Sequence, residues 1–193
     1  EDFAWFESPD KNRLSHCLQV LETMGAVTAG GETLTALGEA MQDWSLHPRL
    51  ACVLEAAKAN ATTETVAPLA LALELGQISG RGVTLLDCLD GDLRAWLASG
   101  FFQREFLRVF NRKPGLQMRV QSMDGILKCF LQGYSDLVGQ IKKKKDRVYD
   151  VQLASGGKVY LQTDHALKEG DLILILDVFE SKDSGSVPRP YVT

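Results

Sequence analysis

Positively charged side chains recur at a regular spacing in the middle of this chain of 193 residues. Arg104, Arg108 and Arg112 follow one another every four residues, and Lys113 continues the series. Because residues four apart lie on one face of a helix, we expect a row of cations along a helix over residues 102–112. Arginine can bond a phosphate through two N–H groups, so the row predicts a nucleic-acid backbone site. A solvated helix face with an acidic neighbour explains the same pattern without a ligand.

The densest positive charge lies further along the chain. It comprises Lys142, Lys143, Lys144, Lys145 and Arg147. We expect this run to form a loop between a helix and a strand, where four adjacent lysines cannot all face one partner. A flexible electrostatic tether for nucleic acid is one interpretation, and a solubilising loop is the other and is slightly favoured.

Four phenylalanines accompany the arginines and allow two interpretations. Exposed aromatic rings can stack on the bases of a single strand. Phe102, Phe106 and Phe110, however, share helical spacing, which Phe101 does not. We therefore expect core packing rather than base stacking for these three rings.

The net charge of −4 hides a segregation along the chain. Residues 1–100 carry 6 Lys and Arg against 14 Asp and Glu, a net charge of −8. Residues 101–149 carry 11 against 4, a net charge of +7, and residues 150–193 carry 4 against 7, a net charge of −3. A basic middle between acidic flanks favours an anionic partner, of which nucleic acid is the commonest.

Composition and cysteine usage exclude several classes of protein. No window approaches eighteen consecutive apolar residues, which argues against a membrane span, and the first residues lack the features of a signal peptide. An opening on Glu1 with Trp5 close behind suggests a fragment of a longer chain. The four cysteines form no CxxC pair and no ligand cluster with the three histidines, so we expect buried thiols, no metal site and a cytoplasmic setting.

The elements that must position these residues fall into three segments. In residues 1–46, Ser8-Pro9 is typical of a helix start, and a tight hairpin around Gly30-Gly31 separates this helix from a second one capped by Thr35. Residues 47–133 have helical periodicity throughout, beginning with Pro48 at a first helical position. In residues 134–193 the period changes to that of strands, expected over 148–153, 158–162 and 172–179, with a tail from 188.

We therefore expect an α+β fold that is mainly α. Residues 1–46 should form a winged helix, residues 47–133 a helical bundle, and residues 134–193 part of a small β-barrel with a tail. Three strands cannot close a barrel, so other elements must complete it.

The order of these pieces resembles the C-terminal region of DEAH-box RNA helicases. Residues 21–27, 34–41 and 47–51 match that family's pattern "LxxLGAL…LTxLGxxMxxLPxxPRLA", and His47 before Pro-Arg-Leu-Ala looks like the bacterial HrpB type. Residues 90–94 resemble the "DL-x-R" stretch of the helical ratchet domain. Residues 133–138 resemble the "AYPDRIA" start of the oligonucleotide-binding barrel. Ser135 and Leu137 replace the Pro and Arg of that last motif, so a role of its Arg is not carried over.

The resemblance implies an accessory region of an ATP-dependent RNA helicase. It would follow two motor domains that bind ATP and Mg²⁺, form one wall of the channel for single-stranded RNA, and convert motor closure into strand movement. This chain has neither GxxxxGK[ST] nor Asp-Glu-x-His, so no cofactor and no catalytic residue is expected in it, and alone it should be inactive. Its expected partners are single-stranded RNA and the motor domains. Apolar surface is expected near Phe3, Trp5 and Pro48-Arg49, where the motor would pack.

Two functions of other classes remain open. A winged-helix regulator that reads DNA needs a basic recognition helix, but the segment over residues 35–44 carries Glu39 and Asp43 and no Lys or Arg. A protein-interaction module would dock its acidic first hundred residues on a partner and bind no nucleic acid. His47 and Arg49 are expected to have capping or packing roles rather than catalytic ones.

Overall fold

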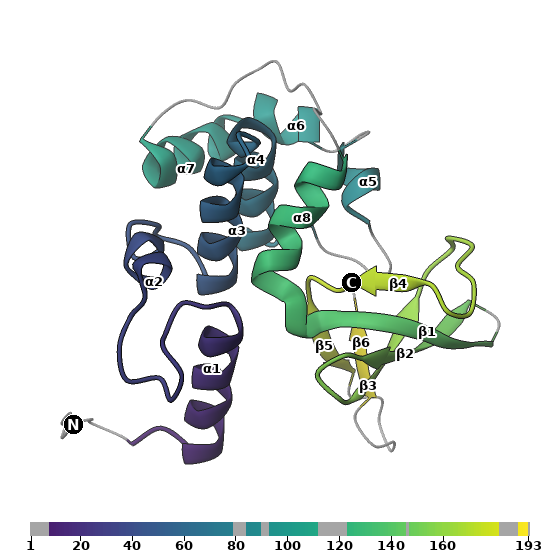
Figure 1. Cartoon of the computed structure of the whole chain (residues 1–193). Coiled ribbons are helices and arrows are strands. Elements are labelled where there is room, and N and C mark those ends of the chain that lie inside the picture. The colour runs from purple at the N-terminus through teal and green to yellow at the C-terminus, as the bar shows by residue number, and fades with distance from the viewer. Residues whose placement is uncertain are drawn as a thin grey trace.

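A computed structural model describes residues 8–78, 84–89, 93–111, 123–145, 147–181 and 189–192. Helices fill the first two thirds of the chain and a small sheet the last third, side by side (Figure 1). The helices are α1 Lys11–Thr23, α2 Ala36–Met41, α3 Pro48–Ala59, α4 Thr63–Glu74, α5 Leu85–Asp87, α6 Leu93–Ala98, α7 Gly100–Phe110, α8 Met123–Tyr134 and the 3-10 turn η2 Ser135–Leu137. The strands are β1 Val138–Lys145, β2 Val148–Leu153, β3 Lys158–Gln162, β4 Leu172–Leu174, β5 Val178–Ser181 and β6 Arg189–Val192. The α+β class with helices in the majority agrees with the sequence prediction.

The first helix begins later than its sequence suggested. Asp10, not Ser8, is the N-cap of α1, and its Oδ1 accepts a hydrogen bond from the backbone N–H of Arg13 at 2.9 Å. Ser and Asp are about equally good capping residues, and here the Asp10 carboxylate makes the capping bond. None of the α1 side chains is buried, and Leu14 is 44 % exposed.

The tight hairpin forms as predicted, and the second helix begins where predicted but ends at Met41, before Trp44. Val27 and Leu34 make an antiparallel bridge, and the N–H of Gly31 donates to the carbonyl of Thr28 at 2.8 Å to close the turn. The Oγ1 of Thr35 accepts from the N–H of Gly38 at 3.1 Å, which caps α2.

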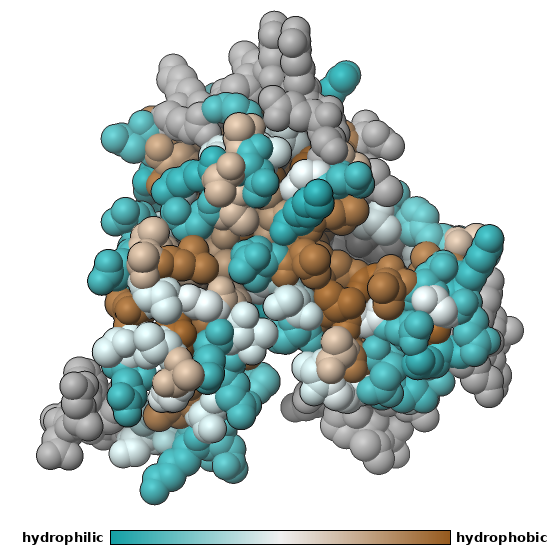
Figure 2. Space-filling model, viewed as in Figure 1, coloured by the Kyte–Doolittle hydropathy of each residue, from teal (hydrophilic) through white to brown (hydrophobic). Residues whose placement is uncertain are grey.

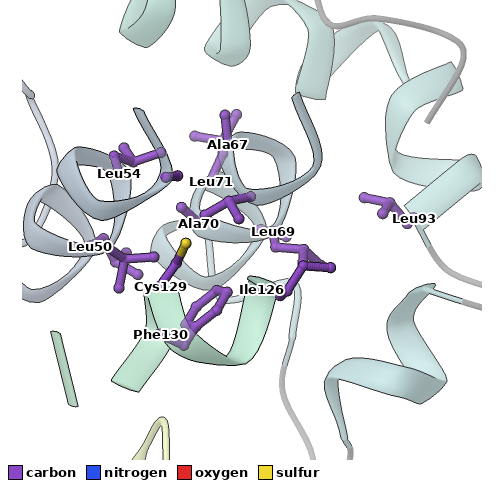
Figure 3. Packing of buried hydrophobic residues seen from close by; sticks show 14 of the residues in the cluster. Leu50, Leu54, Ala67, Leu69, Ala70, Leu71, Leu93, Ile126, Cys129 and Phe130 are labelled. Atoms are coloured by element: carbon purple, nitrogen blue, oxygen red, sulfur yellow. The ribbon is translucent and has the colours of Figure 1, made fainter. Parts of the chain in front are cut away.

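The main core lies where α3, α4 and α8 pack together. Leu54, Leu69, Leu71 and Phe130 are fully buried there, and Cys129 joins them (Figure 3). The two ends of the helical sequence meet in this core, since α3 and α8 are far apart along the chain and share the most extensive helix contact. The helical core is thus closed only when α8 returns to α3, directly before the strands begin.

The six strands form one sheet in the order β4-β1-β2-β3-β6-β5. All pairs are antiparallel except β3 with β6. The edge strands β4 and β5 are joined by residues 175–177 alone, and so short a link keeps the two edges close together. The sheet is therefore curled around a core of its own, formed by Ile141, Tyr149, Val151, Val159, Leu161 and Ile175.

Three expectations about the strands were wrong. The lysine run was expected in a loop, but Lys142–Lys145 lie in β1. One strand was expected over 172–179, but the side chain of Asp177 accepts a hydrogen bond from the N–H of Val178 at 2.8 Å and the ladder breaks there. The expected tail contains β6, whose backbone pairs with β3 and β5.

The four cysteines carry no disulfide. Cys52, Cys88 and Cys129 are buried as expected, whereas Cys17 on α1 is exposed. Burial, with a further contribution from Glu55, raises the pKa of Cys52 to about 11, so this thiol stays protonated and unreactive at neutral pH. No helix in the described parts of the chain is long and apolar enough to cross a membrane.

Exposed apolar side chains gather on α8 and β4. Figure 2 shows a brown area over the lower part of α8 and toward the sheet. Leu127 and Leu131 of α8 are exposed and lie one helical turn apart, and Leu172 of β4 is 71 % exposed. Of the places where apolar surface was expected, Phe3 and Trp5 lie outside the described residues.

Candidate nucleic-acid interface

Helix α7 has one buried and one exposed face. Phe102 and Phe106 are buried, while Phe101, Arg104 and Arg108 are exposed. Arg104 and Arg108 lie one helical turn apart, as their spacing predicted. The exposed face therefore combines two cations with an aromatic ring that is 50 % exposed.

The two arginines differ in their partners. The Nε of Arg108 lies 2.8 Å from Oε2 of Glu105, so its charge is partly neutralised. Its side chain is still 64 % exposed, and exchanging such a surface pair for a phosphate costs little. Arg104 has no ion pair within the described part of the chain. It is the more available of the two cations.

The predicted row of three arginines is cut short at the end of α7. The helix was expected over residues 102–112, but it spans Gly100–Phe110, and Asn111 adopts a left-handed conformation with φ 49°. Asparagine tolerates this conformation and commonly ends helices. Arg112 and Lys113 follow this stop and lie outside the described residues, so the helix itself presents two arginines, not three.

Aromatic packing explains most of the phenylalanine cluster. The rings of Phe106 and Phe110 have centroids 4.4 Å apart, and Phe110 meets Trp44 edge-on at 5.6 Å. Phe102 packs beside Phe106. Core packing is thus confirmed for these three rings, of which Phe110 is partly buried, whereas Phe101 is half exposed.

The second basic cluster lies at the end of the β1–β2 hairpin. The register sets Lys143 opposite Asp150 and Lys145 opposite Val148, with a shift between Ile141 and Lys143 where Lys142 is extra. Such a shift is a β-bulge, which bends the strand and twists its end.

Two cations of this cluster have described side chains. The Nζ of Lys142 donates to Oε1 of Gln140 and remains exposed. Arg147 pairs with Asp164 at 2.6 Å, but both side chains are at least 75 % exposed. The structure therefore brings Lys142–Lys145 and Arg147 together at one end of the sheet, on a different element from α7.

A bidentate ion pair joins the helical part to the sheet. Arg49 of α3 donates through Nη1 to Oδ1 of Asp136 at 2.5 Å and through Nη2 to Oδ2 at 2.8 Å. Its Nη1 also donates to the carbonyl of Gly133 at 2.9 Å, and its guanidinium lies 5.4 Å from the ring centroid of Tyr134. Arg49 thus holds the turn η2, from which β1 starts.

The electrostatics of this ion pair, the clamp between Arg49 and Asp136, favour the charged form of the Asp136 carboxyl. Burial alone would raise the pKa of Asp136, but the hydrogen bonds and the charge of Arg49 outweigh it and hold that pKa below its ordinary value. Both partners lie in motifs that the sequence analysis quoted, residues 47–51 and 133–138, but nothing in the sequence paired them. They lie 87 residues apart, and spacing does not reveal a contact of that range.

His47 has the capping role that was expected of it. Its Nδ1 accepts from the N–H of Arg49 at 3.3 Å, and its own N–H donates to Oε2 of Glu74 at 3.0 Å. Burial lowers the pKa of His47; the charge of Glu74 opposes this shift, while that of Arg49 adds to it. At neutral pH this imidazole is therefore uncharged and free to accept.

We expect the stability of the chain to fall as pH drops below about 6.5, partly through His47. In that range His47 is protonated in the unfolded state but still neutral in the folded state. The unfolded state therefore binds more protons, and lowering the pH stabilises it relative to the folded state. The decrease in Tm between pH 7.5 and pH 5.5 should be smaller in His47→Asn, because asparagine caps without titrating. His16 and His165 are present in both proteins, so an equal decrease in both would contradict this role of His47.

A further contact reaches the sheet from α5. The Nε2 of His165, after β3, lies 3.1 Å from Oδ2 of Asp87, which also caps α5 through Thr84. Hydrogen bonds from Thr84, with a smaller contribution from His165, lower the pKa of Asp87. No group of three or more His, Cys, Asp or Glu side chains that could hold a metal ion occurs among the described residues.

Comparison with known proteins gives a match in structure alone. No family model matches the chain, and no curated protein does. The solved structures that share its fold include the Escherichia coli DExH-box NTPase HrpB, with a TM-score of 0.68, and the Escherichia coli DEAH/RHA helicase HrpB, with 0.66, each at 22% sequence identity. They cover 97% and 92% of this chain, which spans about a fifth, 21%, of each of theirs.

Proposed function

We propose that this chain is the accessory C-terminal region of an ATP-dependent RNA helicase of the DEAH-box class. The proposal is supported by the fold it shares with the HrpB helicase structures over nearly its whole length. ATP and Mg²⁺ would bind to motor domains elsewhere in the parent protein, because this chain has none of the phosphate-binding motifs. Its own task would be to hold single-stranded RNA and to transmit motor movement to it.

The three segments would be the subdomains of that region. Residues 1–46, with α1, the tight hairpin and α2, would be a winged helix. Residues 47–133 would be the ratchet-like bundle and residues 134–193 an oligonucleotide-binding barrel. The last assignment is supported by strand pairing, since the segment containing β4 and β5 pairs with β1 at one end and β6 at the other.

The RNA would contact two basic surfaces. Arg104 and Arg108 on the exposed face of α7 would bind phosphates, and Phe101 beside them would stack on a base. The β1–β2 end, with Lys142–Lys145 and Arg147, would supply the second surface. In oligonucleotide-binding barrels the loop between the first two strands is one of those that contact the nucleic acid. The observation that carries this proposal is the pair of exposed arginines one turn apart on α7.

The clamp between Arg49 and Asp136 would couple the two surfaces mechanically. A bidentate pair, a backbone carbonyl and a ring contact hold the start of β1 against α3. A push on the helical part would therefore move the barrel with it. Both RNA contacts would then advance together when the motor closes.

Charge reversal on α7 tests the RNA path. We expect Arg104→Glu/Arg108→Glu to weaken binding of a labelled single-stranded RNA at least about tenfold in fluorescence anisotropy. The matched control is Lys11→Glu/Arg13→Glu, which makes the same charge change on exposed residues of α1 and should bind nearly as well as the parent chain. Equal weakening by both variants would mean that binding responds to net charge alone. Full binding by the α7 variant would show that the RNA does not bind along this helix.

A protein-interaction module is the second candidate. It is favoured by the exposed apolar side chains of Leu127, Leu131 and Leu172. That function requires no salt-sensitive RNA binding, so absence of binding even at low salt would favour it. A DNA-reading regulator is disfavoured because α2 offers no Lys or Arg.

A further inference from the structure

A pocket lies where the ends of α3, α4 and α8 meet the start of β5. Its volume is about 540 Å³. Figure 1 shows β5 beginning beside the lower end of α8. Leu73, Leu137 and Leu176 supply apolar walls, and the polar groups come from Glu74, Tyr134 and Asp177. The pocket is thus built jointly by the helical part and the sheet.

The hydroxyl of Tyr134 is left without a partner in this pocket. The residue is only 5 % exposed, yet its hydroxyl makes no hydrogen bond with any described residue. Burial raises the pKa of Tyr134 to about 12. The charge of Arg49 opposes this shift, whereas the charges of Asp177 and Glu74 add to it. The phenol is therefore neutral and can donate or accept. No side-chain oxygen or nitrogen of the described residues is both closed off from solvent and unpaired, so this hydroxyl is open to the pocket and is free to bond a ligand there.

The charge in the pocket is negative. Glu74 and Asp177 are exposed and form no ion pair within the described residues, and each keeps carboxylate lone pairs beyond its one backbone contact. Arg49 also lines the pocket, but Asp136 already neutralises it. His47 is uncharged at neutral pH. Two carboxylates thus remain without a cation.

We propose that this pocket binds a lysine or arginine side chain presented by a neighbouring protein segment. The ammonium or guanidinium group would lie between Glu74 and Asp177 and donate to the Tyr134 hydroxyl. The methylene stem would cover the leucine walls, as long basic side chains do on apolar surfaces. This inference does not depend on RNA binding, because none of the pocket residues belongs to the two basic surfaces.

The test uses the full chain labelled with ¹⁵N and a blocked dipeptide, acetyl-leucyl-arginine amide, as the probe. We expect saturable shifts of the backbone resonances of Tyr134, Leu176 and Val178 in NMR titration. Acetyl-leucyl-citrulline amide has nearly the same shape without the charge and should bind at least about threefold more weakly. Equal binding of the two dipeptides, or shifts only elsewhere, would overturn the proposal.

Three variants sharpen the result. Glu74→Gln and Asp177→Asn keep the oxygens that accept from the backbone but remove the charge, and each should weaken the arginine dipeptide about threefold to tenfold. Asp43→Asn, an exposed site outside the pocket, is the matched control and should leave binding unchanged. Unchanged binding in both pocket variants would contradict the proposal. Tighter binding of free spermidine than of the dipeptide would also overturn it, in favour of a small-polyamine site.

Discussion

Replacing Arg49 with methionine should lower the free energy of unfolding by about 2–3 kcal/mol. The substitution leaves the carboxylate of Asp136, whose side chain is only 16 % exposed, without its bidentate partner. It also removes the donor to the Gly133 carbonyl. Fully buried pairs cost more when one partner is lost, and the partial exposure of this pair lowers the expected value. Urea unfolding monitored by circular dichroism measures it.

Two further variants separate the clamp from a general effect of charge. The double variant Arg49→Met/Asp136→Leu should recover at least half of the loss, because no uncompensated charge remains. Glu105→Gln removes one partner of the exposed pair on α7 and should change stability by less than about 0.5 kcal/mol. A loss at Arg49 no larger than that at Glu105 would show that the clamp does not hold the sheet to the helices.

Gly133→Ala should destabilise the chain by about 3 kcal/mol. Gly133 lies on the face of α8 that packs against α3. A Cβ atom there would come within 2.4 Å of the Arg49 carbonyl oxygen and 2.8 Å of Cγ2 of Val53. Backbone cannot yield as a flexible side chain can, so α3 and α8 would have to separate. The same urea experiment measures this loss.

The matched control for this helix contact is Gly100→Ala at the start of α7. Apart from its chain neighbours and the backbone of its own helix, no described heavy atom lies within 4 Å of the Cβ that it would introduce. Alanine is the better helix former, so the change in stability should be neutral or slightly favourable, within about 0.5 kcal/mol. A Gly133→Ala protein as stable as the Gly100→Ala protein would mean that α3 and α8 are not closely packed.

Local signals in the sequence predicted the helical part well. Pro48 at a helix start, the cap at Thr35 and the apolar periodicity of α3 and α4 depend on neighbours in the chain. The hairpin at Gly30-Gly31 is equally local, because both residues need positive φ. The start of α1 was misplaced for a local reason, since Ser8 and Asp10 are both good capping residues.

The sheet was predicted less well because its strands depend on distant partners. Lysine is depleted in strands, so Lys142–Lys145 gave no strand signal, and β1 forms through pairing with β2 and β4. Pro190 disfavours a strand, yet β6 pairs in parallel with β3, through Tyr160 and Leu161.

The candidate site also has a part that local sequence signals predicted and a part that depends on distant contacts. The four-residue spacing correctly predicted that Arg104 and Arg108 share a face of α7. The left-handed Asn111 that ends the helix before Arg112 has only a weak sequence signal. The clamp of Arg49 to Asp136 and the pocket beside it join residues that are far apart in the sequence, and no pattern along the chain identifies them.

The most direct test of the central claim, that single-stranded RNA binds along α7, is the salt dependence of RNA binding. Each phosphate contacted on a single strand contributes about 0.7 to the slope of log K against log salt concentration. The account predicts that Arg104→Gln/Arg108→Gln reduces the magnitude of this slope by about 1.4 relative to the parent chain. An unchanged slope, or no binding by the parent chain at low salt, would contradict it.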